Sequence, residues 1–504
     1  MIKNVDIKEV LAENTRLTAE VRDLREQVQL LMDKKYGRKS ETLNPNQLHL
    51  FANGKTEEDV ALELPQEDQS KAKLKPVKKR KGNGRVPFPE HLTRERVEIE
   101  VAECDRGCPD CGETMQHIGT EITERGEIIP AKIVVKQYAQ HRYACKNGHA
   151  VITAKAPAGV VDRAKYEASV YAHIVTKKYC DHVPLHRLEG IFKRQGFRIP
   201  KQTMWDMVYR VGELFEPIVK EMKAQVLAAE YIQADETILK VAIGSPKGLK
   251  QGYLWAYKDK DRVIFDYTEG RSRAGPTTFL GDYKGIFQTD GYPGYNEICD
   301  KNDLKHGGCW AHARRKFRDA LIGSKREASE CLIHINRLFQ IERLLKEKRD
   351  KEGLSPEEFL EIRAKVRTRF SKRVLLRLMA CLYRIDLEGR QSNKALLSKA
   401  MTYLANQKAP LALFLKEPLL EIDNNAVERD MKHIAVGRKN WLFAGSAKGA
   451  KAAALLFTLI ASCKAMKIDP EAYIKDVLSR LDTTPAKDVA KLTPWAWAGE
   501  NSDN

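Results

Sequence analysis

The chain has 504 residues, more than one domain usually holds, so we expect several modules. Its 87 Lys and Arg residues against 69 Asp and Glu give a formal net charge of +18, which favours a polyanionic partner such as nucleic acid. A hydrophobic content of 42% excludes a wholly disordered chain. The sequence has no apolar run long enough to span a bilayer and no secretion signal, so we expect a cytoplasmic protein without a membrane partner.

Residues 1–43 predict a coiled-coil dimerisation segment. Two sets of mostly apolar side chains recur every seven residues and suit a and d positions: Ile7, Asn14, Val21 and Val28, then Val10, Leu17, Leu24 and Leu31. β-Branched residues at a and Leu at d favour a parallel dimer, in which Asn14 would set the register. The alternative is an amphipathic helix that packs on its own chain.

Residues 44–90 predict a polar linker that ends in a basic run. Lys71–Arg85 contains eight basic residues and no acidic one, together with Pro and Gly, so it cannot build a core. The densest part is predicted to bind DNA phosphates and comprises Lys78, Lys79, Arg80 and Lys81. The alternative is a flexible, solvated tail.

Residues 91–158 predict a zinc-binding domain. Cys108 and Cys111 form a C-x2-C pair, and Cys145 and His149 form a C-x3-H pair. Three thiolates and one imidazole suit a tetrahedral structural Zn²⁺, although Cys104 could replace His149 as the fourth ligand. The alternating text between the two pairs predicts two strands that join them in a zinc ribbon. The remaining cysteines are scattered singly through apolar contexts and are predicted to be ordinary buried thiols: Cys180, Cys299, Cys309, Cys331, Cys381 and Cys463.

Residues 159–226 predict a helical region with a helix-turn-helix outline. One apolar-periodic helix ends at a break around Gln195-Gly196, and a second begins after Pro200. Candidate DNA contacts near the start of the second helix are Lys201, Gln202 and Thr203. The alternative is an ordinary helical hairpin.

From about residue 228 the sequence pattern becomes typical of short strands followed by helices, which predicts a domain with a central sheet. Asp235 lies inside the first strand, and Asp290 closes a later one. Glu428 lies about one turn inside a helix that Asp423 or Asn424 could cap. Cleavage or joining of DNA at phosphorus uses two divalent ions held by a few carboxylates, and Mg²⁺ prefers such oxygen ligands.

Basic residues accompany these carboxylates. Those predicted to contact the DNA backbone are His312, Arg314, Arg315, Arg429, Lys432, Arg438 and Lys439. The alternative is a solvated basic helix face. Among 69 acidic residues, spacing alone does not single out one catalytic triple.

Four sequence motifs single out one catalytic triple by their resemblance to a known family. ADETILKV around Asp235, QTDGYPGY around Asp290, CWAHARRKF from Cys309, and DNNAVERDMKHIAVGRKNWLF around Glu428 resemble the insertion sequence 66 family of bacterial transposases. The resemblance extends to YGRKSETL, the zinc-binding cysteines, DHVPLHRLEGIF and LTPWAW, and so covers nearly the whole chain. The chain departs from the family where Cys145 and His149 stand in place of a second C-x2-C pair.

The resemblance implies a multidomain α+β protein: a coiled coil, a zinc ribbon, a helix-turn-helix region and a ribonuclease H-like α/β catalytic core of the DDE type. The core is expected at 227–322 and 411–463, an all-helical insertion at 323–410, and a helical tail at 464–504. Ser355, Pro356 and Glu358 form a capping box that supports a helix in the insertion. Asp235, Asp290 and Glu428 would then bind Mg²⁺ or Mn²⁺.

The implied function is a DNA transposase that binds terminal inverted repeats and catalyses strand cleavage and strand transfer. Its expected partners are double-stranded DNA at the transposon ends and target, a second copy of the chain or a higher oligomer, and two small companion proteins of the same element. The alternatives are a non-catalytic DNA-binding regulator derived from a transposase and a structure-specific nuclease without strand transfer. Because a retired enzyme commonly loses one carboxylate, the presence of all three favours the enzyme.

Overall fold

The structure is a computed structural model that describes residues 7–36, 133–144, 151–153, 159–160, 165–243, 248–389 and 395–501. The chain divides into two compact units, residues 1–62 with 140–504, and residues 63–139. Two sets of predicted site residues lie outside the described residues, Lys78–Lys81 and the candidate zinc ligands Cys104, Cys108, Cys111, Cys145 and His149. Of the second unit, only residues 133–139 are described.

The predicted N-terminal helix is present as α1 (Ile7–Tyr36). Its apolar stripe is turned outward, since Leu17, Leu24 and Leu31 are 46%, 54% and 67% exposed. The opposite face is polar and partly buried, and the Glu26 carboxylate accepts a hydrogen bond of 3.3 Å from the Leu396 backbone N–H. In the described structure the helix therefore does not pack its apolar stripe on its own chain.

The two strands predicted between the cysteine pairs fall largely outside the described residues, which in this region are 133–144. Residues 133–141 form no strand, and Val134 and Val135 are 71% and 82% exposed. The observed hairpin consists of β1 (Arg142–Ala144) and β2 (Val151–Thr153), which are antiparallel and flank residues 145–150. Alternation favours a strand in this region, but strands require a pairing partner, and no described segment pairs with residues 133–141.

The predicted strands after residue 228 form one mixed sheet. It comprises β3 (Tyr231–Ile243), β4 (Gly248–Asp259), β5 (Arg262–Thr268), β6 (Ile286–Gln288) and β7 (Lys305–Gly307), in the order β5-β4-β3-β6-β7. The first three are antiparallel, whereas β6 and β7 run parallel to β3. Short helices connect the parallel strands: α6 (Ala274–Leu280), η3 (Pro293–Tyr295) and α7 (Asn296–Lys301). Parallel pairing places the carboxyl ends of β3 and β6 on the same side of the sheet.

Helices from both flanks of the sequence share one hydrophobic core with the sheet. They are α3 (Ala168–Tyr179), α4 (Leu185–Arg194), α5 (Lys201–Leu227), α15 (Ala447–Ala465) and α16 (Pro470–Arg480), followed by η6 (Leu481–Thr483), η7 (Ala486–Leu492) and α17 (Pro494–Asn501). The predicted break between α4 and α5 is confirmed, with Gly196 at a φ of +76° that other residues rarely adopt. In the helical hairpin formed by α4 and α5, Lys201 and Gln202 at the start of α5 are therefore exposed to solvent. The later turns of α5 pack in the core.

No single described helix is long and apolar enough to cross a membrane. Ala447–Ala465 and Pro470–Thr483, which are bent by 120° at their junction, meet the length and composition criteria only as a pair.

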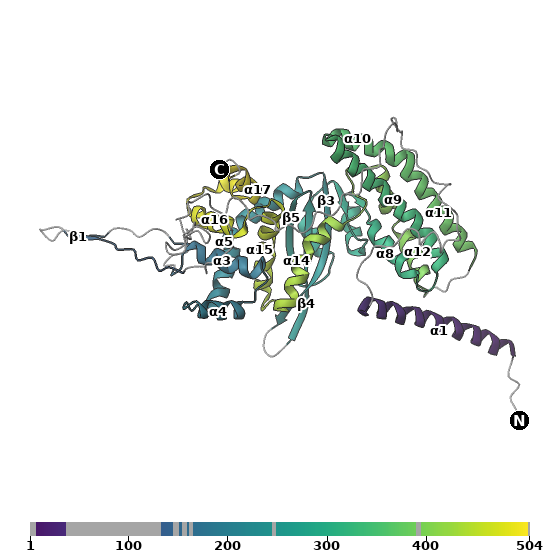
Figure 1. Ribbon diagram of the computed structural model, residues 1–504, viewed down its shortest axis with the longest axis horizontal. Helices are drawn as coiled ribbons and strands as arrows, with labels where there is room; N and C mark the ends of the chain where they lie inside the picture. The colour runs from purple at the N-terminus through teal and green to yellow at the C-terminus, as the bar shows by residue number, and fades with distance from the viewer. Residues whose placement is uncertain are drawn as a thin grey trace, which may run out of the picture. The chain divides into compact units, whose positions relative to one another are not determined.

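A second core lies in the segment that follows β7 (Figure 1). It is built by α8 (Trp310–Ala320), α9 (Lys325–Glu352), α10 (Pro356–Val366), the π-helical η4 (Arg367–Ser371), α11 (Lys372–Leu387), α12 (Leu396–Asn406), α13 (Lys408–Ala412) and η5 (Leu413–Leu415). The predicted capping box is confirmed, because Ser355 Oγ accepts from the Glu358 N–H at 3.2 Å and the Glu358 carboxylate accepts from the Ser355 N–H at 2.9 Å. The described part of the expected insertion is therefore helical.

A buried ion cluster ties this helical segment to the chain that follows it. Glu342 accepts hydrogen bonds from Arg363 and Arg367, and the three side chains are 4%, 2% and 0% exposed. Arg367 also donates to the backbone carbonyls of Phe414 at 2.8 Å and Leu420 at 2.9 Å. Because buried charges require such partners, the cluster holds residues 414–420 against α9 and η4.

Candidate active site

Asp235 and Asp290 each follow a glutamine on one of two adjacent parallel strands. Gln233 of β3 pairs with Gln288 of β6, and each aspartate lies two residues further along. Since side chains alternate between the two faces of a sheet, the Asp235 carboxylate lies on the same face as Gln233. The Asp290 carboxylate accepts from the Tyr292 N–H at 2.9 Å, which fixes it just beyond the end of β6.

The two glutamines bind each other and the segment that leads to Glu428. Gln233 Nε2 donates to Gln288 Oε1 at 2.8 Å and to the Asp423 carbonyl at 3.0 Å. Gln288 Nε2 donates to the carbonyls of Gly308 at 2.9 Å and Glu421 at 2.8 Å. Both glutamines are buried, so these bonds are costly to break. Sequence reasoning missed them, although the repeated Gln-x-Asp pattern at 233–235 and 288–290 was a usable signal.

Glu428 stands in the first turn of α14 (Asn425–Trp441). Of the two capping residues predicted, Asp423 and Asn424, it is Asn424 that occupies the N-cap position. Its side chain, however, makes no capping hydrogen bond to the helix. Instead, Asn424 Nδ2 donates to the Ala234 carbonyl at 2.8 Å, and Asp423 Oδ1 accepts from the Asn425 N–H at 3.1 Å. The helix start is therefore bound directly beside Asp235.

The carboxylates lie close enough to act on one another's charge. Burial, together with the negative charges of Asp290, Glu236 and Glu428, raises the pKa of Asp235 to about 8. Burial and the charge of Asp290 likewise raise the pKa of Glu236, against which its hydrogen bonds from Tyr295 and Arg271 act. Neighbouring carboxylates repel one another when ionised, and a bound cation would offset this repulsion, so the group is suited to bind a cation. Glu236 was not predicted, and its position beside Asp235 was the available signal.

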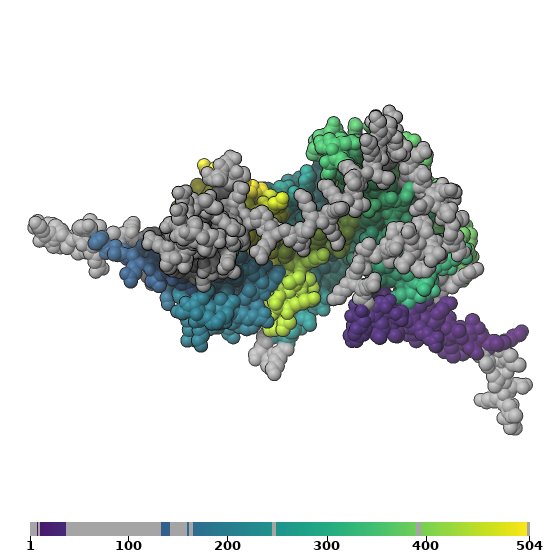
Figure 2. Space-filling view, in the orientation of Figure 1, coloured from purple at the N-terminus to yellow at the C-terminus, as the bar shows by residue number. Residues whose placement is uncertain are grey.

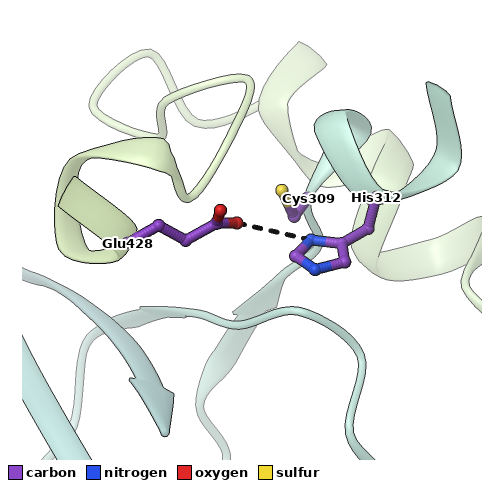
Figure 3. A group of neighbouring side chains, drawn as sticks. All are labelled: Cys309, His312 and Glu428. Carbon is purple, nitrogen blue, oxygen red and sulfur yellow. Dashed lines mark ion pairs between the residues drawn. The ribbon is translucent and has the colours of Figure 1, made fainter. Parts of the chain in front are cut away.

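Glu428 also faces α8. Its Oε1 lies 3.8 Å from His312 Nδ1 (Figure 3). Its Oε2 lies 3.8 Å from Arg315 Nη2. Arg314 points elsewhere, since its guanidinium lies over the Phe339 ring, 4.2 Å from the centroid. Of these three predicted DNA contacts, two therefore lie against the candidate catalytic glutamate.

The remaining predicted DNA contacts on described helices are mostly at the surface. Lys201 and Gln202 at the start of α5 are exposed and Thr203 is half-buried. On α14, which reaches the surface in Figure 2, the exposed residues are Arg429, Lys432 and Lys439. The half-buried Arg438 donates to the Ile238 carbonyl, so part of its hydrogen-bonding capacity already serves the fold.

The raised pKa of Asp235 predicts that the protein loses stability as the pH rises. The folded state keeps the Asp235 proton up to about pH 8, whereas an unfolded aspartate releases it near its ordinary pKa of about 3.9. Between these two values the folded state binds more protons, so the free energy of unfolding falls with pH by up to about 1.4 kcal/mol per unit. Urea unfolding from about pH 5 to about pH 9 measures this slope.

Asp235→Asn is expected to reduce the slope, whereas Asp482→Asn, at an exposed position on η6, leaves it unchanged. An equal slope in wild type and Asp235→Asn would show that Asp235 does not hold this proton.

The fold and site define a mixed α/β protein with one carboxylate inside β3, one just beyond the end of the parallel strand β6, and one at a helix start. The chain belongs to the IS66 transposase family: the family model described as "Transposase IS66 family" matches residues 163–452. Three further models match, "Transposase C of IS166 homeodomain" at 23–97, "zinc-finger binding domain of transposase IS66" at 105–147, and "IS66 C-terminal element" at 458–495. The resemblance inferred from the sequence is thus confirmed along most of the chain.

Relatives of similar length occur in Sinorhizobium fredii. Uncharacterized protein y4jD is 32% identical over 511 residues, which cover 96% of both chains. Uncharacterized proteins y4hP and y4qI are 30% and 31% identical, each across 83% of this chain and 78% of the relative.

Proposed function

We propose that the chain is a DDE transposase with a ribonuclease H-like core, in which Asp235, Asp290 and Glu428 bind the catalytic cations. The observation that carries the proposal is that Asp235 and Asp290 each lie two residues beyond the paired glutamines of two parallel strands, with the start of α14 bound beside Asp235. The strand order also supports it, because three antiparallel strands followed by two parallel ones, β5-β4-β3-β6-β7, are the arrangement expected of such a core.

The residues present fit divalent cations such as Mg²⁺ or Mn²⁺. All three donors are carboxylates, which these ions prefer, and their mutual repulsion raises the pKa of Asp235. Two such ions, when bound, supply activation of a water or 3′-hydroxyl and stabilisation of the leaving oxygen. Gln233, Gln288 and Asn424 position the carboxylates through the bonds described above. The exposed basic residues of α14 would hold the phosphate backbone beside them.

The N-terminal modules are proposed to bind the terminal inverted repeats and to join two copies of the chain. Structural zinc at residues 105–147 is supported by the match to the zinc-finger family. The outward apolar stripe of α1 supports pairing with the same stripe of a second copy.

Substitution of this stripe is expected to weaken the dimer. Leu17→Glu with Leu24→Glu places charges at two d positions, where each buried Leu contributes about 1.5–3 kcal/mol. The dissociation constant of the dimer should therefore rise by at least about tenfold. Analytical ultracentrifugation measures it, and Gln29→Glu, an exposed position on the same helix, is the matched control. If the Leu variants and the control dimerise equally, the stripe is not the interface.

The proposed activity is tested with DNA that carries the element's own ends. Wild-type protein with Mg²⁺, assayed with and without the companion proteins, should cleave at the ends and join them to a target. Cleavage without joining would identify a structure-specific nuclease, and end binding without cleavage under both conditions would identify a regulator.

A further inference from the structure

Cys309, His312 and Glu428 bring three different metal-binding groups together. Their ligand atoms all lie within 4.8 Å of one another, and within the ranges that the structure describes no other three His, Cys, Asp or Glu residues do so. Figure 3 shows the Glu428 carboxylate from α14 pointing at the imidazole of His312, with the Cys309 sulfur beside them. Asp235 and Asp290 are not members of this group.

The local sequence builds two of these ligands from one helix end. Cys309 is the N-cap of α8, and His312 follows three residues later, so both side chains lie on the same side of the first turn. Cys309 Sγ accepts a hydrogen bond from the backbone N–H of Asn424 at 3.3 Å. Backbone donors directed at a sulfur stabilise a metal-bound thiolate, and the Asn424 bond also ties the sulfur to the start of the helix that carries Glu428.

The spacing and chemistry of the group fit zinc. Ligand atoms around a tetrahedral Zn²⁺ lie roughly 3.3–3.7 Å apart, and His312 Nδ1 is 3.8 Å from Glu428 Oε1. Sulfur and nitrogen donors favour Zn²⁺ over Mg²⁺, which prefers oxygen ligands only. Arg315 lies against the other carboxylate oxygen, Oε2, and leaves Oε1 directed at the group.

We propose that Cys309, His312 and Glu428 form a Zn²⁺ site, separate from the zinc-finger region at residues 105–147. Three protein ligands leave a fourth position for water, as in an open zinc site. Glu428 cannot serve this ion and the cations of Asp235 and Asp290 equally well. Zn²⁺ is therefore an inhibitor of Mg²⁺-dependent cleavage, a consequence that rests on the function proposed above.

Zinc content tests the site without reference to activity. The full-length chain is equilibrated with Zn²⁺, desalted, and its zinc measured per chain by atomic emission. Wild type should hold one equivalent more than Cys309→Ser or His312→Gln, because zinc bound at residues 105–147 is common to all three. Since Cys309 is fully buried, His312→Gln, whose parent side chain is 23% exposed, keeps the test decisive if Cys309→Ser misfolds.

Two variants outside the group serve as controls, Cys180→Ser and His433→Gln, which should keep the wild-type zinc content. Substitution with Co²⁺ should also give a thiolate charge-transfer band that is weaker in Cys309→Ser than in Cys180→Ser. Equal zinc content in wild type and His312→Gln would overturn the proposal.

Inhibition is measured as the Zn²⁺ concentration that halves Mg²⁺-dependent cleavage, each protein relative to its own zinc-free rate. His312→Gln should need at least about 100-fold more Zn²⁺, because loss of a residue that only supports a metal ligand already costs about 10–100-fold in affinity. An unchanged concentration would overturn the inhibitory role. If wild type does not cleave at all, the proposed transposase activity fails while the zinc content still decides the site.

Discussion

Asp235→Asn and Asp290→Asn are each expected to lower Mg²⁺-dependent cleavage by at least about 10³-fold while leaving the binding of DNA ends intact. Asparagine has the shape of aspartate but cannot carry the negative charge that a divalent cation requires, and this loss is worth several kcal/mol in the transition state. Rates of end cleavage and electrophoretic binding to the same DNA measure the two effects separately.

The adjacent carboxylate provides the matched control. Glu236 directly follows Asp235 in the sequence, but its carboxylate accepts hydrogen bonds from Arg271 and Tyr295. Glu236→Gln should therefore cost about 10–100-fold, the range of a residue that only supports a metal ligand. Equal losses of cleavage for Glu236→Gln and Asp235→Asn would contradict the assignment of Asp235, rather than Glu236, as the cation ligand. Full cleavage by Asp290→Asn would refute the proposed site.

Arg367→Met is expected to destabilise the helical segment by about 3–5 kcal/mol, the usual cost of breaking a buried ion pair on one side. The change leaves Glu342 with Arg363 alone and removes the donors to the Phe414 and Leu420 carbonyls. Hydrogen exchange of peptides from α9 and from residues 414–421 measures the local free energy of opening. Because the Glu421 carbonyl accepts from Gln288, loosening of this segment should also slow cleavage.

Two comparisons separate the buried cluster from ordinary surface charge. Arg343 pairs with Glu347 on the exposed side of α9, so Arg343→Ala should change the opening free energy by less than about 0.5 kcal/mol. Replacing Glu342, Arg363 and Arg367 together by Leu, Met and Met should cost less than Arg367→Met alone, because no unpaired charge stays buried. Unchanged exchange in Arg367→Met would show that the cluster does not hold residues 414–421.

Patterns confined to neighbouring residues were sufficient for much of the local structure. The capping box at Ser355, the break before Gly196 and the burial of most scattered cysteines all follow from the sequence, because caps, turns and apolar contexts act within a few residues. The strands that carry Asp235 and precede Asp290 were also predictable. The identity of the family came from four blocks of text rather than from any physical pattern.

Only the tertiary structure decided which of these residues meet. The parallel register that sets Asp235 beside Asp290, the buried Gln233–Gln288 bond and the approach of Glu428 to Cys309 and His312 all join segments far apart in the chain. The outward direction of the apolar stripe of α1 was likewise settled only by the packing of the opposite, polar face. Periodicity reports which side of an element avoids water, but a pairing register depends on the second segment. The carboxylates of Asp235, Asp290 and Glu428 therefore form a candidate cation site only once the sheet and α14 are assembled.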